Sequence, residues 1–156
     1  VFLNGGLFPD LHHPTRMQKL VAGPLGPLMA RLANEKTYSR GLQEVMNKPP
    51  SAEELHQHWL ATSRNGGKLV LPKLLGYIAE RRANEERWVG ALTGTPEVPK
   101  RFVWGPEDPV SGAHVLPEIR SRVPEADVHV IEGVGHWPQL EDVAAVAAAL
   151  RLRPSG

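Results

Sequence analysis

Asp108 and His136 have the residue types and the setting of an acid–base pair in a hydrolytic site. Each follows a short apolar run that a glycine ends, with Gly105 before Asp108 and Gly133 before His136. A carboxylate beside a histidine fixes the imidazole tautomer and stabilises the imidazolium that forms when the histidine accepts a proton. Separately, Asp108 could cap a turn and His136 could be an ordinary loop residue. Their positions after successive predicted strands favour the catalytic interpretation.

The segments that carry this pair alternate between strand and helix. Apolar runs predict strands over residues 101–104 and 126–131, with helices expected over residues 117–123 and 143–152. This order is typical of a parallel sheet, and ligands of such sheets bind beyond the carboxyl ends of the strands. The sequence therefore predicts that both candidate residues lie at one edge of the sheet.

The chain before residue 93 has a different pattern. Residues 1–4 form an apolar run that Gly5 and Gly6 end, which predicts a further buried strand. From residue 14 to residue 92 the apolar side chains recur at helical spacing, and no convincing strand is found. We therefore expect an α/β fold in which residues 1–13 and 93–156 form part of a sheet domain and residues 14–92 form a helical insertion.

Composition excludes several classes of function. The 156 residues are 41% hydrophobic, which is enough for a core, and the net charge of +1 gives no case for nucleic acid or an anionic membrane as partner. The absence of cysteine excludes disulfides, thiolate metal sites and a cysteine nucleophile, and it fits an intracellular setting, so we expect a cytoplasmic protein. The first residue is Val1, so we also expect upstream sequence.

The residues around the pair resemble a known family. Residues 104–109 (WGPEDP) and 133–142 (GVGHWPQLED) look like the acid and histidine motifs of the α/β-hydrolase superfamily, in the form of its haloalkane dehalogenase and epoxide hydrolase branch. Residues 3–9, 39–42 and 87–92 resemble the mesoderm-specific transcript homologues of that branch. The resemblance covers nearly all of this chain but only the carboxyl-terminal half of the family's fold.

The resemblance implies strands six to eight of the hydrolase sheet, an inserted helical cap over residues 14–92, and a catalytic triad with His136 as base and Asp108 as acid. It implies no cofactor. The nucleophile motif, Gly-x-Ser-x-Gly or Gly-x-Asp-x-Gly, is absent from the sequence and in the family lies upstream. Serine would imply an ester substrate and aspartate an epoxide or haloalkane. The expected partners are a small apolar substrate and the missing amino-terminal half, without which we expect no activity.

Other residues are candidates for the same site. Asp10 is an alternative acid, because some dehalogenase relatives place the acid after strand six. Asn4 could point its amide into the site, although it could equally satisfy the turn that follows it. Tyr38 and Tyr77 could donate hydrogen bonds to an epoxide oxygen, as cap tyrosines do in epoxide hydrolases, but packing explains Tyr77 more simply. Trp137, next to the histidine, is expected to contact the substrate.

The remaining polar clusters predict no separate chemistry. His56 and His58 diverge in a predicted helix and lack a third ligand, so no metal site is expected. Arg81 and Arg82 are expected on a solvated part of a helix. Two other functions remain open: a hydrolase-fold protein kept for binding, and a self-contained small α/β domain. An upstream turn without a nucleophile would favour the first, and cooperative unfolding of this segment as a stable monomer would favour the second.

Overall fold

The fold contains a parallel sheet of three strands, and the candidate residues lie at one edge of it. The computed structural model describes residues 1–151, and the sheet order is β1-β2-β3. The strands are β1 (Phe2–Leu3), β2 (Arg101–Trp104) and β3 (Asp127–Val130). Phe2 is in register with Phe102, and Phe102 with Val128. All three predicted strands are therefore confirmed, including the one that opens the chain.

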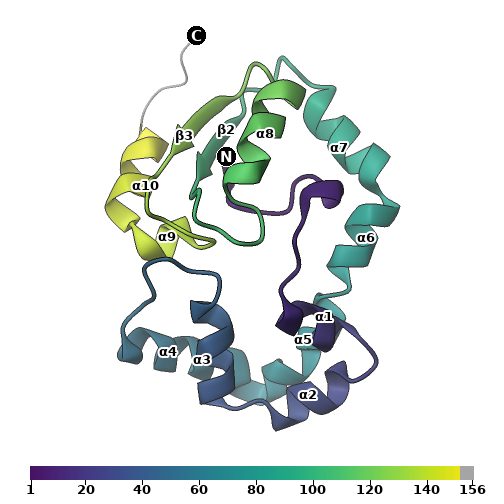
Figure 1. The fold of residues 1–156 in the computed structure, drawn as a ribbon, viewed down its shortest axis with the longest axis vertical. Helices are drawn as coiled ribbons and strands as arrows, with labels where there is room; N and C mark the ends of the chain where they lie inside the picture. Colours follow the sequence, from purple (N-terminus) through teal and green to yellow (C-terminus); the bar gives the residue numbers. More distant parts are fainter. Residues whose placement is uncertain (152–156) are drawn as a thin grey trace.

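Helices cover both faces of the sheet. The chain passes from β2 through η3 (Ala113–Val115) and α8 (Leu116–Arg122) to β3, and then through α9 (Pro138–Glu141) to α10 (Val143–Arg151). Successive side chains of a strand point to opposite faces. Phe102 and Trp104 accordingly pack with Ile119 of α8, whereas Val103 packs with Val146 of α10. Figure 1 shows α8 and α10 beside the sheet. Residue 152, the last of the predicted terminal helix, lies outside the described residues.

The long segment between β1 and β2 contains helices joined by loops, as predicted. After η1 (Pro9–Leu11) it contains α1 (Arg16–Ala22), α2 (Gly26–Leu32), α3 (Glu35–Gln43), α4 (Ala52–Ser63), η2 (Arg64–Val70), α5 (Leu71–Leu74), α6 (Tyr77–Ala83) and α7 (Glu85–Thr93). In Figure 1 α1 to α5 lie below the sheet, and α6 and α7 return along one side toward β2. We call residues 14–92 the helical region. Over residues 1–151 no helix has the length and apolar character needed to cross a membrane.

Candidate active site

Asp108 and His136 form a direct pair at the carboxyl edge of the sheet. Their loops follow β2 and β3, and Asp108 Oδ2 lies 2.7 Å from His136 Nδ1. The Asp108 side chain is fully buried, whereas 20% of the His136 side chain is exposed. The buried carboxylate therefore orients the imidazole through Nδ1, which leaves Nε2 for proton transfer to a bound molecule.

Three further hydrogen bonds hold the Asp108 carboxylate. The Val110 backbone N–H donates to Oδ1 at 2.7 Å, and the Ser111 hydroxyl donates to Oδ2 at 2.8 Å. The Asn4 amide donates to Oδ2 at 3.1 Å. Burial alone would raise the pKa of Asp108, but the hydrogen bond and positive charge of His136, together with Asn4 and Val110, outweigh burial and lower this pKa to about 2. Asp108 is therefore an ionised carboxylate at neutral pH.

Asn4 links the end of β1 to the loop that carries the acid. Its side-chain amide donates to the Gly105 carbonyl oxygen at 2.9 Å, and its side-chain oxygen accepts from the Gly105 N–H at 2.6 Å. The same amide reaches Asp108. The side chain thus continues the pairing of β1 with β2 beyond the last backbone bonds, and it points into the site.

Glu141 binds the histidine loop to the helical region. Its Oε2 accepts hydrogen bonds from the backbone N–H groups of Gly135 at 2.9 Å, Asn47 at 2.8 Å and Lys48 at 2.8 Å. Its Oε1 accepts from the Trp137 N–H at 3.2 Å. Hydrogen bonds to a charged group are among the stronger ones. Sequence analysis did not identify this role, because the partners are backbone groups that no side-chain pattern reveals.

The helical region and the histidine loop lie so close together that the residue before His136 has no room for a side chain. A Cβ on Gly135 would lie 2.7 Å from the Val45 carbonyl oxygen and 2.9 Å from the Asn47 nitrogen. The His136 N–H donates to that same Val45 oxygen at 2.9 Å. The Asn47 amide donates to the Gly133 oxygen at 2.8 Å. We call this contact between residues 45–48 and 133–141 the junction.

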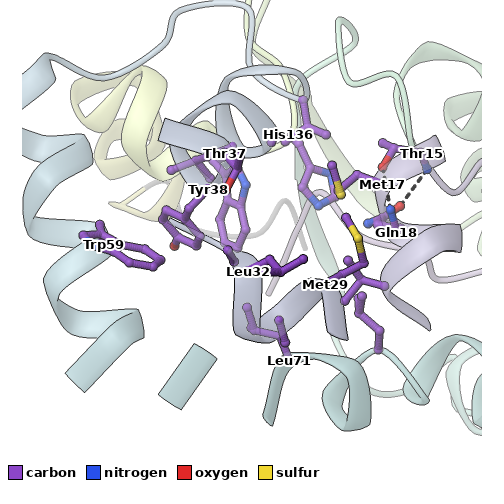
Figure 2. A pocket seen from close by; sticks show the side chains of 18 residues that line it. Thr15, Met17, Gln18, Met29, Leu32, Thr37, Tyr38, Trp59, Leu71 and His136 are labelled. Carbon is purple, nitrogen blue, oxygen red and sulfur yellow. Dashed lines mark hydrogen bonds between the residues drawn. The ribbon is translucent and has the colours of Figure 1, made fainter. Parts of the chain in front are cut away.

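An apolar cavity of about 440 Å³ lies between His136 and the helical region. Figure 2 shows His136 extending into it from one side and Trp59 on the other. Trp137, the residue next to the histidine, also lines it. Most of the wall is apolar and includes Met17, Met29, Leu32, Leu71 and Leu75. A space of this size and character suits a small apolar molecule held with its reacting group near the imidazole.

Tyr38, Tyr77 and Asp10, the other sequence candidates, lie in different surroundings. Tyr38 lines the cavity, and its hydroxyl accepts a hydrogen bond from Thr62 at 3.0 Å. Tyr77 does not line the cavity; its ring lies 4.9 Å from the Arg81 guanidinium. Asp10 accepts a hydrogen bond from Arg122 at 2.9 Å, with 46% of its side chain exposed. The structure thus brings Asp108, and not Asp10, to His136.

Two other sequence interpretations concern histidine and arginine clusters. Within residues 1–151 no group of three or more His, Asp or Glu side chains is placed to hold a metal ion. His56 instead lies 2.9 Å from Glu35. The expectation that Arg81 is solvated is wrong: its Nε and Nη2 atoms are buried, because the side chain turns inward from α6 onto the loop after β1.

The chain belongs to the alpha/beta hydrolase family, whose sequence model matches residues 1–149. It is 40% identical over 145 residues to the mesoderm-specific transcript homolog proteins of Bos taurus and Homo sapiens, covering 89% of this chain and 43% of each relative. It is 35% identical over 151 residues to LipZ of Mycobacterium tuberculosis, which is named as a hydrolase, covering 96% of this chain and 52% of LipZ. The chain therefore spans about half the length of the curated relatives it matches.

A solved structure supports the same fold. A protein of Acinetobacter baumannii that is named as a lipase matches with a TM-score of 0.59, covering 94% of this chain and 48% of its own. Sequence identity is 19%, so this likeness concerns the fold alone. The predicted α/β-hydrolase fold is confirmed by the family match and by this neighbour.

Proposed function

We propose that this chain supplies the acid, the base and the helical cap of a hydrolase that acts on a small apolar ester, epoxide or haloalkane. The observation that carries the proposal is the Asp108–His136 pair, 2.7 Å apart, with His136 lining an apolar cavity of about 440 Å³. Membership of the alpha/beta hydrolase family supports the same reaction class. The nucleophile comes from the part of the family's fold that precedes this segment.

The reaction proceeds in two steps. If the nucleophile is serine, His136 takes its proton and passes it to the departing alcohol as the acyl-enzyme forms. If it is aspartate, its carboxylate displaces halide from a haloalkane, or opens an epoxide whose oxygen stays on the alkyl group and takes up a proton, and an alkyl-enzyme ester forms. His136 Nε2 then takes a proton from water as the water oxygen attacks the carbonyl carbon of the covalent ester; the ester C–O bond breaks, and the imidazolium returns its proton to the departing oxygen, which is the serine hydroxyl of an acyl-enzyme or the alcohol product of an alkyl-enzyme. Asp108, ionised and fixed by Asn4 and Ser111, stabilises the imidazolium during this step.

The polarity of the cavity wall indicates what kind of substrate group this chain contacts. Thr15, Gln18, Thr37 and Tyr38 are polar residues in its wall, but among residues 1–151 no Asp, Glu, Lys or Arg side chain lines it. A charged substrate group would be costly to bury there without a partner. The group that enters the cavity is therefore apolar and uncharged.

The proposal is tested on the complete protein with three substrates that separate the chemistries: 4-nitrophenyl butyrate, styrene oxide and 1-bromobutane. Wild type should hydrolyse at least one of them. Changing His136→Gln should lower kcat by about a thousandfold or more, and with an aspartate nucleophile it should trap the alkyl-enzyme for intact-mass spectrometry. The matched control is His114→Gln, since His114 is exposed and does not line the cavity.

Two results would contradict this function. A complete protein that binds apolar ligands but turns over none of the three substrates would instead be a hydrolase-fold binding protein. Appreciable His136-dependent turnover by residues 1–156 alone would show that no upstream nucleophile is needed. Under the proposal, the isolated segment gives none, because a base and its orienting acid do not replace a nucleophile.

A further inference from the structure

The Arg81 guanidinium is inserted beneath the loop that follows β1. Its Nη1 donates a hydrogen bond to the Gly6 carbonyl oxygen, and its Cζ lies 4.9 Å from the centre of the Tyr77 ring. A Cβ at position 6 would collide with this guanidinium. Gly6 is therefore the residue that allows a charged side chain from the helical region to enter here. Arg82, its neighbour on α6, is exposed.

The other edge of this guanidinium is buried without a partner. Within residues 1–151, Arg81 Nε and Nη2 are inaccessible to solvent and make no hydrogen bond. Both ring nitrogens of His12 are likewise buried and make no hydrogen bond within residues 1–151, and the residue is only 9% exposed. Unsatisfied buried donors are costly, and a charged one most of all. By contrast, the buried Asp108 carboxylate has a partner on each oxygen.

His12 lies within electrostatic reach of both Arg81 and the catalytic pair. Burial, together with the positive charges of Arg81 and His136, lowers the pKa of His12 to about 4 against the opposing effect of Asp108. At neutral pH His12 is therefore a neutral imidazole with one donor and one acceptor nitrogen. Neither His12 nor Arg81 lines the apolar cavity. The next residue, His13, donates its N–H to the oxygen of Val110, which itself donates to Asp108. Arg81 reaches Gly6, two positions after the Asn4 that also donates to Asp108, so both side chains lie close to the loop that carries the acid.

We propose that Arg81 and His12 form a buried subsite for a carboxylate, next to the Asp108–His136 pair. Nε and Nη2 form the side edge of a guanidinium, and their two parallel N–H groups match the two oxygens of one carboxylate. His12 can donate a further hydrogen bond to the same group. A carboxylate suits one guanidinium better than a phosphate does, because a phosphate dianion would keep half of its charge uncompensated.

This subsite deepens the proposed function and rests on it for the substrate's orientation. The apolar part of the substrate lies in the cavity, the acid group lies on Arg81, and the reacting bond lies between them at His136. The same carboxylate chemistry has a second possible source, an Asp or Glu side chain from the upstream part of the complete protein. Either source satisfies the same two nitrogens, and the experiment below separates them.

The test is the binding of butyrate to the complete protein by isothermal titration calorimetry. Arg81→Gln should weaken binding by roughly tenfold or more, because two charge-assisted hydrogen bonds are lost. Arg82→Gln removes the same charge from an exposed position on the same helix and should leave the affinity within about twofold. Arg81→Lys keeps the charge but not the two-pronged geometry, so it should also weaken binding even if the glutamine variant folds poorly.

Binding is measured without turnover, so an inactive protein still gives an answer, and failure of the subsite is distinguishable from failure of the hydrolase proposal. If wild type binds no butyrate, the crystal structure of the complete protein decides. An Asp or Glu carboxylate about 3 Å from Arg81 Nε and Nη2 would support the subsite with an internal occupant. Water alone on that edge would overturn the proposal, as would equal butyrate affinities for wild type and Arg81→Gln, or equal losses from Arg81→Gln and Arg82→Gln.

Discussion

The sheet edge and the helical region hold their residues in different ways. At the sheet edge, Asp108 of the Asp108–His136 pair accepts hydrogen bonds from Asn4, Val110 and Ser111. Phe102, Val103 and Trp104 of the adjoining strand are 0% exposed. In the helical region only a few apolar side chains are buried. Many of its large apolar side chains remain exposed, among them Leu25, Leu28, Leu32, Leu60 and Leu74.

The difference separates two tasks. Proton transfer requires atoms held within a fraction of an ångström, and a strand end with satisfied hydrogen bonds provides such atoms. A cavity wall requires only apolar side chains of suitable size, which tolerate substitution more easily. Changes at the sheet edge should therefore alter kcat, and changes in the helical region should alter the choice and affinity of substrate.

The largest effect is expected from the acid. Asp108→Asn in the complete protein should lower kcat by roughly 10³–10⁴-fold, because the amide cannot hold the imidazole in the same tautomer or stabilise the imidazolium. Steady-state kinetics measures this change. Glu107→Gln, at the exposed neighbouring position, is the control and should have little effect. A small loss for Asp108→Asn together with a large one for Asp10→Asn would reassign the acid to Asp10.

The next effect concerns stability against acid. Unfolded His12 binds its proton near pH 6.5, but folded His12 binds it only near pH 4. Between these values the unfolded state holds more protons, so the free energy of unfolding falls as pH is lowered, by up to about 3 kcal/mol at pH 4. The lowered pKa of Asp108 acts in a different window, between about 4 and 2.

Urea unfolding of the complete protein at pH 7, 5.5 and 4 measures this dependence. His12→Gln should flatten it, since glutamine does not titrate. His13→Gln is the matched control and should leave it in place. Equal slopes for wild type and His12→Gln would show that the buried imidazole does not carry the acid sensitivity.

A smaller effect is expected at the junction between the two regions. Glu141→Gln replaces one carboxylate oxygen by an NH₂ group and removes the negative charge that four N–H groups share. The free energy of unfolding should fall by about 2 kcal/mol, and kcat should fall with it because the His136 loop loses its anchor. Glu132→Gln, exposed on the same loop, should change neither quantity measurably. Unchanged stability for Glu141→Gln would mean that the two regions are held together elsewhere.

The smallest effect is expected for Tyr38→Phe. Its hydroxyl is bonded to Thr62, so its loss should change kcat/KM for styrene oxide by less than about threefold. A loss of about a hundredfold or more would instead assign this hydroxyl to the epoxide oxygen and move part of the chemistry into the helical region. Such a result would break the division of tasks described above.

The features that could be predicted from the sequence are those that leave a local pattern in it. Apolar runs ended by glycines locate the three strands, and strand order then places Asp108 and His136 at one edge. Glu141 and Arg81 could not be interpreted in this way. Glu141 reaches the backbone of Asn47, 94 positions away, and Arg81 reaches Gly6, 75 positions away, so neither contact leaves a periodic signal. A buried arginine also contradicts the usual preference of charged residues for solvent, which made the wrong prediction for Arg81 the natural one.

The close contact at Gly135 also limits how the molecule can move. At Gly135, residues 45–48 lie against the histidine loop through backbone atoms, since the Val45 oxygen accepts from the His136 N–H and a Cβ on Gly135 would lie 2.7 Å from that oxygen. A motion that widens the apolar cavity must therefore either carry His136 with it or pivot at this contact. In Figure 1 the far parts of the helical region, α2 and α5, lie away from the sheet. Because Val45 and His136 both line the cavity, the contact at Gly135 ties the position of the imidazole to that of the adjoining cavity wall.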